Sequence, residues 1–488
     1  MPPFHEVLDA RKGRCAVTSA ALRAGSRVLR ASAVCAVASS ACGWCFTPHA
    51  ALSRCAGCRV ARYCSRTCQQ RDWVLHRREC SAWRSVPAAN ASPSVLLVSR
   101  LAAKLFLGSQ AHQDEKNGVL KLRHHLDDHA ALKRRQFRDM TQLVLLLLTR
   151  YTGDKKEQMP SFEALRNELE PEILKLFGRV NCNAFSLAND VTNEAVGIGL
   201  FPDGALFNHD CDPNCVVSFR GREMQVHVVK DVQAGQELTV SYVELLQSTH
   251  ARRTELKASY FFDCECARCH AAAKEEAPDD WFLDGLVCSN KECDGGVVVV
   301  EAAADGDVAV CKMCGGARDG QEIAGYERQL KSIEALKVSA EQDKWEMYQR
   351  AWEIATRRLR LHPRNARVAV MAREIGNFLL DAASVALQRL ALEFCLAELY
   401  AVEWLLPKAK LPSRGLLHLQ IGKLLYEEVN APSCALAPVN RAEQIQKAVK
   451  HLQEALSMLD CAYGSSSAAV QSAQLMLDEV QRAAHELA

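Results

Sequence analysis

The chain has 488 residues, 22 cysteines and a formal net charge of +2. Its length exceeds what one hydrophobic core usually organises, and its near-neutral charge gives no bulk electrostatic reason to expect nucleic acid or a membrane as the main partner. The longest aliphatic run, residues 143–148, is far too short to span a bilayer, and no signal-peptide pattern opens the sequence. We therefore expect a soluble multidomain protein in the cytoplasm and/or nucleus, where clustered cysteines act as metal ligands rather than as disulfides.

The first cysteine group lies at residues 42–80 and supplies enough ligands for two tetrahedral zinc ions. The candidate ligands are Cys42, Cys45, Cys55, Cys58, Cys64, Cys68, His76 and Cys80. Ligand pairs two or three residues apart converge easily on one ion, and so short a segment with little apolar core needs metal to fold. Chance clustering of buried cysteines is the alternative. The order CxxC, CxxC, CxxxC and HxxxC resembles a MYND zinc finger, and this resemblance implies peptide partners.

The same segment is basic, with seven arginines against one aspartate and one glutamate. Trp44, Tyr63 and Trp73 are interleaved with the arginines, which is one pattern of a nucleic-acid surface. A solvated basic face, or a surface for acidic or proline-rich peptides, is the favoured interpretation, because the pattern implies neither groove-reading elements nor repeats.

The second cysteine group combines CxCxxC at Cys264, Cys266 and Cys269 with a ligand from elsewhere in the chain, because a closed zinc site takes four ligands. Valine-rich segments at residues 224–229 and 237–242, with a turn at 233–236 between them, predict short strands in the same region.

Five ordered pieces of this region resemble the SET and MYND domain (SMYD) protein-lysine methyltransferases. They are residues 181–187 (NCNAFSL), 197–201 (GIGLF), 208–214 (NHDCDPN), 237–242 (ELTVSY) and 260–266 (YFFDCEC). The resemblance implies Cys211 as the fourth zinc ligand and transfer of a methyl group from S-adenosylmethionine to a lysine of a histone and/or non-histone protein. Such an in-line displacement requires that the enzyme align a neutral amine with the methyl group and exclude water.

The resemblance also implies a set of site residues. The expected catalytic residues are Tyr242, Tyr260 and Phe185, and the expected cofactor contacts are Lys12, Arg14, His125, Asn183, Asn208, His209, Tyr242 and Phe262. Tyr242 is expected at the transfer point, and aromatic rings are expected to line a channel that accepts the apolar stem and the cationic head of a lysine.

Each of these assignments has a plainer alternative. Tyr242 and Phe185 are packing residues if the family pattern does not apply, Asn208 is a turn asparagine, and His125 is a surface histidine on a helical insert. The sequence departs from the family pattern at Cys15, where a glycine is usual, and at Asp210, where a serine is usual. The first departure puts close approach of the backbone to the cofactor in question, whereas we expect the second to be tolerated.

The third cysteine group has ribbon-like spacing on both sides of an expected strand at residues 297–300. Its members are Cys288, Cys293, Cys311 and Cys314. They predict a zinc site beyond the three described so far, with free cysteines on a glycine-rich and alanine-rich loop as the alternative.

After Arg318 the sequence is poor in cysteine and its apolar residues recur at helical spacing. The recurring residues are Trp345, Tyr348, Trp352, Ala355 and Leu359, and then Ala448, Leu452, Ala455 and Leu459. With turns expected at residues 361–363, 412–415 and 463–464, this pattern predicts paired helices in a TPR-like array.

The predicted fold class is α+β multidomain. It comprises a SET β-fold with an inserted MYND zinc finger, a zinc-bearing post-SET segment and a C-terminal α-helical (TPR-like) domain. The expected divisions are a SET N-terminal part (1–41), the finger (42–80), a helical SET insert (81–178), the SET core (179–245), the post-SET segment (246–272), a zinc ribbon-like segment (273–320) and the helical domain (321–488). We expect a monomer without membrane contact; a degenerate SET and MYND scaffold for peptides and, less favoured, a DNA-binding regulator are the alternative functions.

Overall fold

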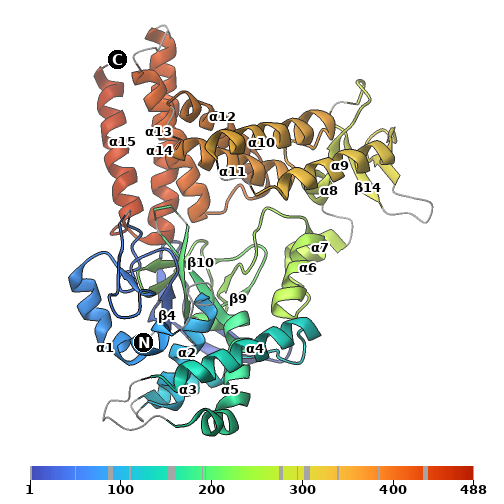
Figure 1. Cartoon of the computed structure of the whole chain (residues 1–488). Coiled ribbons are helices and arrows are strands. Elements are labelled where there is room, and N and C mark those ends of the chain that lie inside the picture. The colour runs from blue at the N-terminus through green and yellow to red at the C-terminus, as the bar shows by residue number, and fades with distance from the viewer. Residues whose placement is uncertain are drawn as a thin grey trace.

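The computed structural model has an α+β architecture, with a strand-rich N-terminal region below a long set of helices (Figure 1). It describes residues 3–49, 51–85, 92–108, 112–151, 160–189, 191–192, 194–273, 279–293, 295–301, 308–337, 340–382, 385–431 and 438–486. No helix within these ranges is long and apolar enough to cross a membrane. The predicted fold class is thereby confirmed.

The strand-rich region is built from short strands that pair across long sequence separations. The strands are β1 (Phe4–Asp9), β2 (Gly13–Thr18), β3 (Arg27–Ser32), β4 (Cys35–Ala38), β7 (Ala184–Ala188), β8 (Ala195–Leu200), β9 (Asn208–His209), β10 (Cys215–Arg220), β11 (Glu223–Val228) and β12 (Thr239–Val240). They form sheets in the orders β10-β11-β3 and β4-β8-β7, an antiparallel β1-β2 pair and a parallel β9-β12 pair. Residues from before and after the finger therefore complete each other's sheets.

The expected strand at residues 237–242 is shorter than the sequence pattern indicates. Only Thr239 and Val240 are in strand geometry, and they pair with β9 rather than with β11. The turn before them is as expected, with Gly235 at a φ of 82°. This pairing places residues 239–240 beside residues 208–209. Both pairs belong to segments on which the family resemblance rests.

The finger and the helical insert follow β4. The finger consists of β5 (Ser53–Arg54), β6 (Arg62–Tyr63) and α1 (Arg66–Arg84), and the insert of α2 (Pro93–Phe106), α3 (Gln113–Leu120), α4 (Ala131–Leu148) and α5 (Phe162–Asn183). Ser65, Ser92 and Ser161 cap three of these helices by accepting a backbone N–H bond. Leu97, Leu101, Leu145 and Leu148 are fully buried where the insert helices meet, so this region has an apolar core of its own.

A second group of small elements follows β12. It comprises α6 (Thr249–Tyr260), α7 (Ala267–Ala273), α8 (Asp279–Asp284) and a four-stranded antiparallel sheet of β13 (Leu286–Val287), β14 (Val297–Glu301), β15 (Val308–Cys311) and β16 (Ala317–Arg318). The strand expected at residues 297–300 is confirmed as β14.

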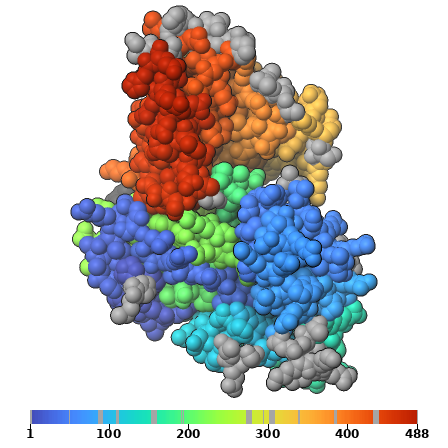
Figure 2. Space-filling model, turned by 90° about the vertical axis from the view of Figure 1, so that its left-hand side faces the viewer, coloured from blue at the N-terminus to red at the C-terminus, as the bar shows by residue number. Residues whose placement is uncertain are grey.

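The C-terminal half consists of helices that pack as sequential neighbours. They are α9 (Gly320–Glu334), α10 (Glu341–Glu353), α11 (Ala366–Asp381), α12 (Val385–Leu405), α13 (Pro412–Asn430), α14 (Pro438–Tyr463) and α15 (Ala468–Glu486). Helix α14 ends on β10 and β11, where Cys461 Sγ lies 3.6 Å from the Val228 carbonyl oxygen, and Arg220 donates to Ser466 nearby. In Figure 2 the red C-terminal helices are seated directly on the blue and green N-terminal region.

One predicted turn in this half is wrong. Pro412 begins α13, so residues 412–415 form its first turn instead of a connection between helices. A proline at the first position of a helix loses no hydrogen bond, because that N–H has no partner within the helix. The turn predicted at residues 361–363 does lie between helices. Of the turn predicted at 463–464, Tyr463 is the last residue of α14 and Gly464, at a φ of 74°, begins the connection to α15.

Candidate functional site: four thiolate clusters and an aromatic centre

The structure brings the predicted metal ligands together as four separate groups. The groups are Cys42/Cys45/Cys64/Cys68, Cys55/Cys58/His76/Cys80, Cys211/Cys264/Cys266/Cys269 and Cys288/Cys293/Cys311/Cys314, and within each group the ligand atoms lie within 4.8 Å of one another. Zinc–sulfur bonds of about 2.3 Å place the sulfurs of a tetrahedral site about 3.8 Å apart. The closest sulfur pairs in the four groups, at 3.6 to 3.8 Å, match that edge. All four groups therefore fit a tetrahedral zinc ion.

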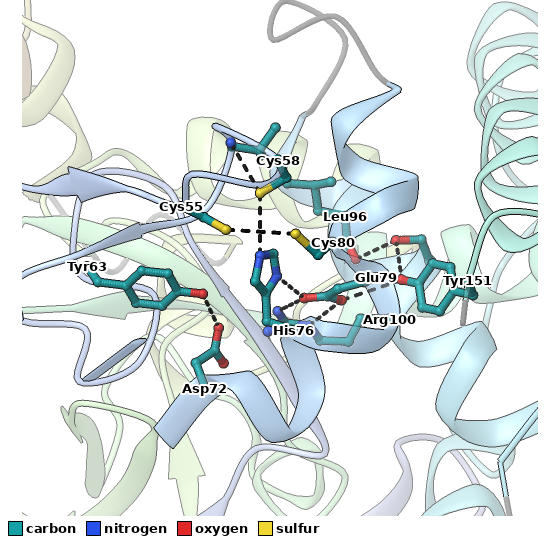
Figure 3. Close-up of polar contacts among 12 residues, drawn as sticks. Cys55, Cys58, Tyr63, Asp72, His76, Glu79, Cys80, Leu96, Arg100 and Tyr151 are labelled. Atoms are coloured by element: carbon teal, nitrogen blue, oxygen red, sulfur yellow. Dashed lines mark hydrogen bonds and ion pairs between the residues drawn. The ribbon is translucent and has the colours of Figure 1, made fainter. Parts of the chain in front are cut away.

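The second finger cluster is buried and continues into a network of charged side chains (Figure 3). His76 directs Nε2 to Cys58 Sγ at 3.4 Å and Nδ1 to the Glu79 carboxylate at 3.3 Å. Arg100, on α2, donates to both oxygens of that carboxylate. Burial opposes ionisation of Glu79, but Arg100 and His76 hold its pKa below the usual range. Sequence spacing alone did not single out Glu79 or Arg100.

The Cys211 cluster packs against Tyr242, Tyr260 and Phe262, which belong to two of the family-like pieces. The structure brings the three cysteines of CxCxxC to Cys211, with Cys211 Sγ 3.6 Å from Cys269 Sγ. Arg252 is fully buried beside the cluster and donates its Nε to Cys211 Sγ at 3.3 Å. A cation here stabilises the negative charge of four thiolates around one zinc ion. Arg252 is a further residue that sequence reasoning missed, because nothing in its local pattern distinguishes it from a surface arginine.

The fourth cluster is held between the ends of β13–β15 and is the least enclosed. Cys314 is exposed and Cys293 is half-buried. Gly296 has little room beside these sulfurs, because a Cβ there would lie 2.3 Å from Cys293 Sγ. The ligand-like convergence of four thiols favours the zinc interpretation over free cysteines on a loop.

Asn208 lies on β9 at the centre of a polar group that joins three sequence-distant segments. Its Nδ2 donates to the Arg14 carbonyl at 3.1 Å, to Cys15 Sγ at 3.2 Å and to Glu237 Oε1 at 3.0 Å. The other Glu237 oxygen pairs with Lys12 Nζ at 2.5 Å. Lys12, Arg14 and Asn208 are thus brought together, and Glu237 is the residue between them that sequence reasoning did not assign.

Cys15, which departs from the family pattern, is buried at this point. Burial raises the pKa of its thiol to about 11, so it is protonated at neutral pH. The glycine that the preceding turn requires is Gly13, which has a φ of 80°. Cys15 therefore faces Asn208 with a neutral thiol, while the backbone freedom of the turn is supplied two residues earlier.

His209 connects the Cys211 cluster to Tyr242. Its Nδ1 accepts the Tyr242 backbone N–H at 3.0 Å, and its Nε2 lies 3.2 Å from Cys211 Sγ. Accepting at Nδ1 assigns the remaining proton of a neutral ring to Nε2, from which it is donated to the sulfur. Burial lowers the pKa of His209 to about 4, which agrees with a neutral ring.

The aromatic residues expected around the transfer point form one group. The Tyr242 ring lies 4.8 Å from that of Tyr260 and 6.5 Å from that of Phe262, measured between centroids. The Tyr242 hydroxyl donates to the Phe207 carbonyl at 2.9 Å, and burial raises its pKa, so the phenol stays protonated. Phe185 is half-buried on β7 and packs with the same hydrophobic cluster as Tyr242.

Asn183 is the last residue of α5 and is turned toward the loop after α3. Its Nδ2 donates to the Arg123 carbonyl at 2.9 Å and to the Arg179 carbonyl at 2.8 Å. Its amide nitrogen thus fixes the chain just before His125.

His125 is not on a helix, contrary to the expectation from its position in the insert. It lies between α3 and α4 with a φ of 46°, stacked on Phe261 at 5.0 Å and bonded to Asp128 at 2.9 Å. Helix α3 already ends at Leu120, and the left-handed backbone of His125, which histidine adopts more readily than most residues, lies in the connection to α4. His125 therefore lies beside the segment of Tyr260 and Phe262.

A cavity of about 770 Å³ opens next to this segment. Phe261, Phe262 and Asn181 line it together with Lys257 and Asp263. Among the expected cofactor contacts, Phe262 lines this cavity, whereas Asn208, His209 and Tyr242 do not.

The comparisons with known proteins agree with these features. A MYND finger model matches residues 42–80. The chain is 32% identical over 234 residues to histone-lysine N-methyltransferase SMYD3 of Mus musculus, covering 48% of this chain and 52% of that protein. It is 33% identical over 238 residues to N-lysine methyltransferase SMYD2 of Homo sapiens, covering 48% and 52%. The chain spans about half the length of the curated relatives it matches, and these matches confirm the resemblance drawn from its sequence.

Proposed function

We propose that this chain, which resembles the SET and MYND domain (SMYD) lysine methyltransferases over about half of its length, transfers a methyl group from S-adenosylmethionine to a lysine side chain of another protein. The observation that carries the proposal is the convergence of His209, Tyr242, Tyr260 and Phe262 on one buried cysteine cluster, with Asn208 next to His209 on β9. These residues come from three separate segments, and a scaffold that only bound peptides would not need them together.

The proposed cofactor end of the site is the polar group at β9. S-adenosylmethionine supplies an electrophilic methyl group on a sulfonium, and Lys12, Arg14, Asn183, Asn208, His209 and His125 are proposed to hold it, with Phe262 against the adenine. The Asn208 carboxamide is oriented by its hydrogen bond to Glu237. The ion pair between Lys12 and Glu237 holds Lys12 in this polar group. Its positive charge there can bind the carboxylate of the cofactor.

The proposed transfer point is Tyr242. Its phenol already donates to the Phe207 carbonyl, so the oxygen directs its lone pairs away from that bond, where they can accept from an incoming amine. Tyr260 and Phe185 are proposed to line the channel with it. Their rings accept the apolar stem of a lysine, stabilise its cationic head before deprotonation and exclude water.

The zinc ions are proposed to have structural roles. Each group supplies four protein ligands, which leaves no open position for substrate. The Cys211 cluster fixes both His209 and the segment that carries Tyr260 and Phe262, so this zinc would set the shape of the site without touching the reaction. We also propose that the chain divides into domains at the residue ranges expected from its sequence, and that the finger binds peptide partners.

The test is calorimetric binding of S-adenosylhomocysteine to the zinc-replete protein and two variants. We expect binding by the wild type, strong weakening in Asn208→Ala, and retained binding in Tyr242→Phe, which should lose transfer to a lysine peptide by about two to four orders of magnitude if its hydroxyl acts in the transition state. Absence of binding by folded, zinc-loaded wild type would contradict the proposal and leave a peptide-binding scaffold.

A further inference from the structure

The finger is joined to the SET strands through charged side chains that are almost completely buried. His76, Glu79 and Arg100 are 0%, 1% and 7% exposed. The Arg100 guanidinium also lies over the Trp83 ring, 5.1 Å from its centroid, and the Tyr151 hydroxyl lies 3.5 Å from Glu79 Oε2. Figure 3 shows the carboxylate of Glu79 between the histidine and the arginine. Burial of such a pair is costly unless each charge is fully matched, as it is here.

Arg100 extends this network into the SET sheet. Its Nη1 donates to the carbonyl of Ala36 at 2.7 Å, and Ala36 is on β4. In the β4-β8-β7 sheet Ala36 is paired with Gly199, which in turn is paired with Phe185. Gly199 lets these strands pack closely, because a Cβ there would lie 2.9 Å from the Phe201 ring and 3.3 Å from the Ala36 side chain. One row of backbone pairs thus runs from the Arg100 contact to Phe185.

A second contact joins the same two regions. Phe46, from the finger, is 3% exposed and belongs to the hydrophobic cluster of the SET strands. A Cβ at Gly197 on β8 would lie 2.9 Å from its ring, so the ring fills the space that this glycine leaves. The finger is therefore packed into the SET sheet as well as hydrogen-bonded to it.

We infer that Glu79 and Arg100 are positioning residues that hold the zinc ligand His76 and tie this zinc ion to strand β4 and, through the paired strands, to Phe185. A carboxylate on the free nitrogen of a zinc-bound histidine fixes the ring and raises its basicity. In this arrangement the second finger zinc is an internal support of the methyltransferase site, and the finger does not move as a separate peptide-binding module. The last step, to Phe185, rests on the proposed function, whereas the zinc assignment does not.

The four clusters allow a site-resolved test in the whole protein. Only the second finger cluster among the four found in the described residues contains a nitrogen ligand, so after replacement of zinc by cadmium-113 its resonance is separate from those of the three all-sulfur sites. We expect Glu79→Gln and Arg100→Lys to weaken metal binding at this site by about 10- to 100-fold, seen as faster loss to a chelator, with the other three resonances unchanged. Tyr151→Phe is the control, because it removes only two long hydroxyl contacts, to Glu79 at 3.5 Å and to Ser99 at 3.3 Å, and leaves the contacts of Glu79 with His76 and Arg100 in place.

If Glu79→Gln loses metal to the chelator from the nitrogen-containing site at the same rate as the wild type, the inference is overturned. Equal loss at all four sites would also overturn it, because that result indicates general unfolding instead of a local role. For the step to Phe185, we expect both variants to raise the KM for a lysine peptide while S-adenosylhomocysteine still binds; unchanged KM would limit the role to the metal. Failure of S-adenosylhomocysteine to bind the wild type would refute the proposed function and leave the cadmium result standing.

Discussion

Helices α1 and α14 show two different ways of stabilising a helix in one chain. Helix α14 buries Ala448, Leu452, Ala455 and Leu459, which are all fully enclosed. Helix α1 buries Asp72, His76 and Glu79 and leaves Val74 68% exposed. The first helix is stabilised by apolar burial, and the second by metal coordination and matched charges. A buried polar face on a helix thus indicates a metal or charge network where an apolar face indicates a packed core.

Removal of zinc should produce the largest difference in stability between the finger and the C-terminal helices. Structural zinc contributes about 10–16 kcal/mol of apparent binding free energy in finger peptides, so chelation should unfold residues 42–80. The α11–α15 helices should keep their structure, because the residues that they contribute to the core are apolar, whereas the zinc ligands Cys288 and Cys311 join the same core from the sheet before α9. Limited proteolysis with mass mapping would then find cuts in the finger first. Simultaneous cleavage of both regions would show that the helices also depend on metal.

Arg100→Met should be the next largest effect. It leaves Glu79 buried without its guanidinium partner, which costs about 3–5 kcal/mol in comparable buried pairs. Denaturant unfolding followed through the fluorescence of Trp83, over which Arg100 lies, would measure the change. Leu452→Ala in α14 is the matched apolar truncation and should cost about 2–5 kcal/mol. Zinc loading should change the loss of unfolding free energy in the Arg100 variant and leave the loss in the Leu452 variant unchanged. The opposite result would contradict the comparison of the two helices.

The helical half should respond to acid through His418. This residue is 3% exposed, and burial, with His451, Arg414 and Lys450 nearby, lowers its pKa from 6.5 to about 4. The unfolded chain then binds more protons than the folded one between these values. Stability from this group is therefore complete above pH 6.5 and falls by at most roughly 3 kcal/mol as the pH is lowered to 4. Unfolding free energies of wild type and His418→Gln should converge at low pH; parallel pH curves would refute the assignment.

The smallest effect should come from Glu244, two residues after Tyr242. Its carboxylate pairs with Arg373 of α11 at 2.9 Å, and the pair is partly exposed. Burial opposes ionisation, but Arg373 holds the pKa of Glu244 below its usual range, so this stabilisation is present above about pH 4.5 and lost below it. Glu244→Gln should cost about 0.2–1 kcal/mol at low salt and less at high salt. A salt-independent loss measured by urea unfolding would point to packing instead.

The sequence was most informative where ligands or apolar residues recur at short spacing. The eight finger ligands and the apolar face of α14 were predicted from local pattern, and the family-like pieces indicated Asn208 and Tyr242. Arg100 and Arg252 were missed, because each acts on a residue far away in the chain and has no local signal. Glu237 was not assigned a role although it opens the family-like piece at residues 237–242, because its partner Asn208 is distant in the chain. His125 was misplaced because α3 ends at Leu120, and no proline or glycine between Leu120 and His125 marks that end in the sequence.

The order of strands along the chain has a consequence for synthesis on the ribosome. Strand β4 at residues 35–38 must wait for β8 at residues 195–200, and β3 must wait for β11 at residues 223–228. All eight finger ligands, in contrast, lie within residues 42–80 and can bind metal as soon as that segment emerges. Zinc availability in the first seconds of translation, at about 5–20 residues per second, thus determines whether the early strands have a folded neighbour while their pairing partners are still being made.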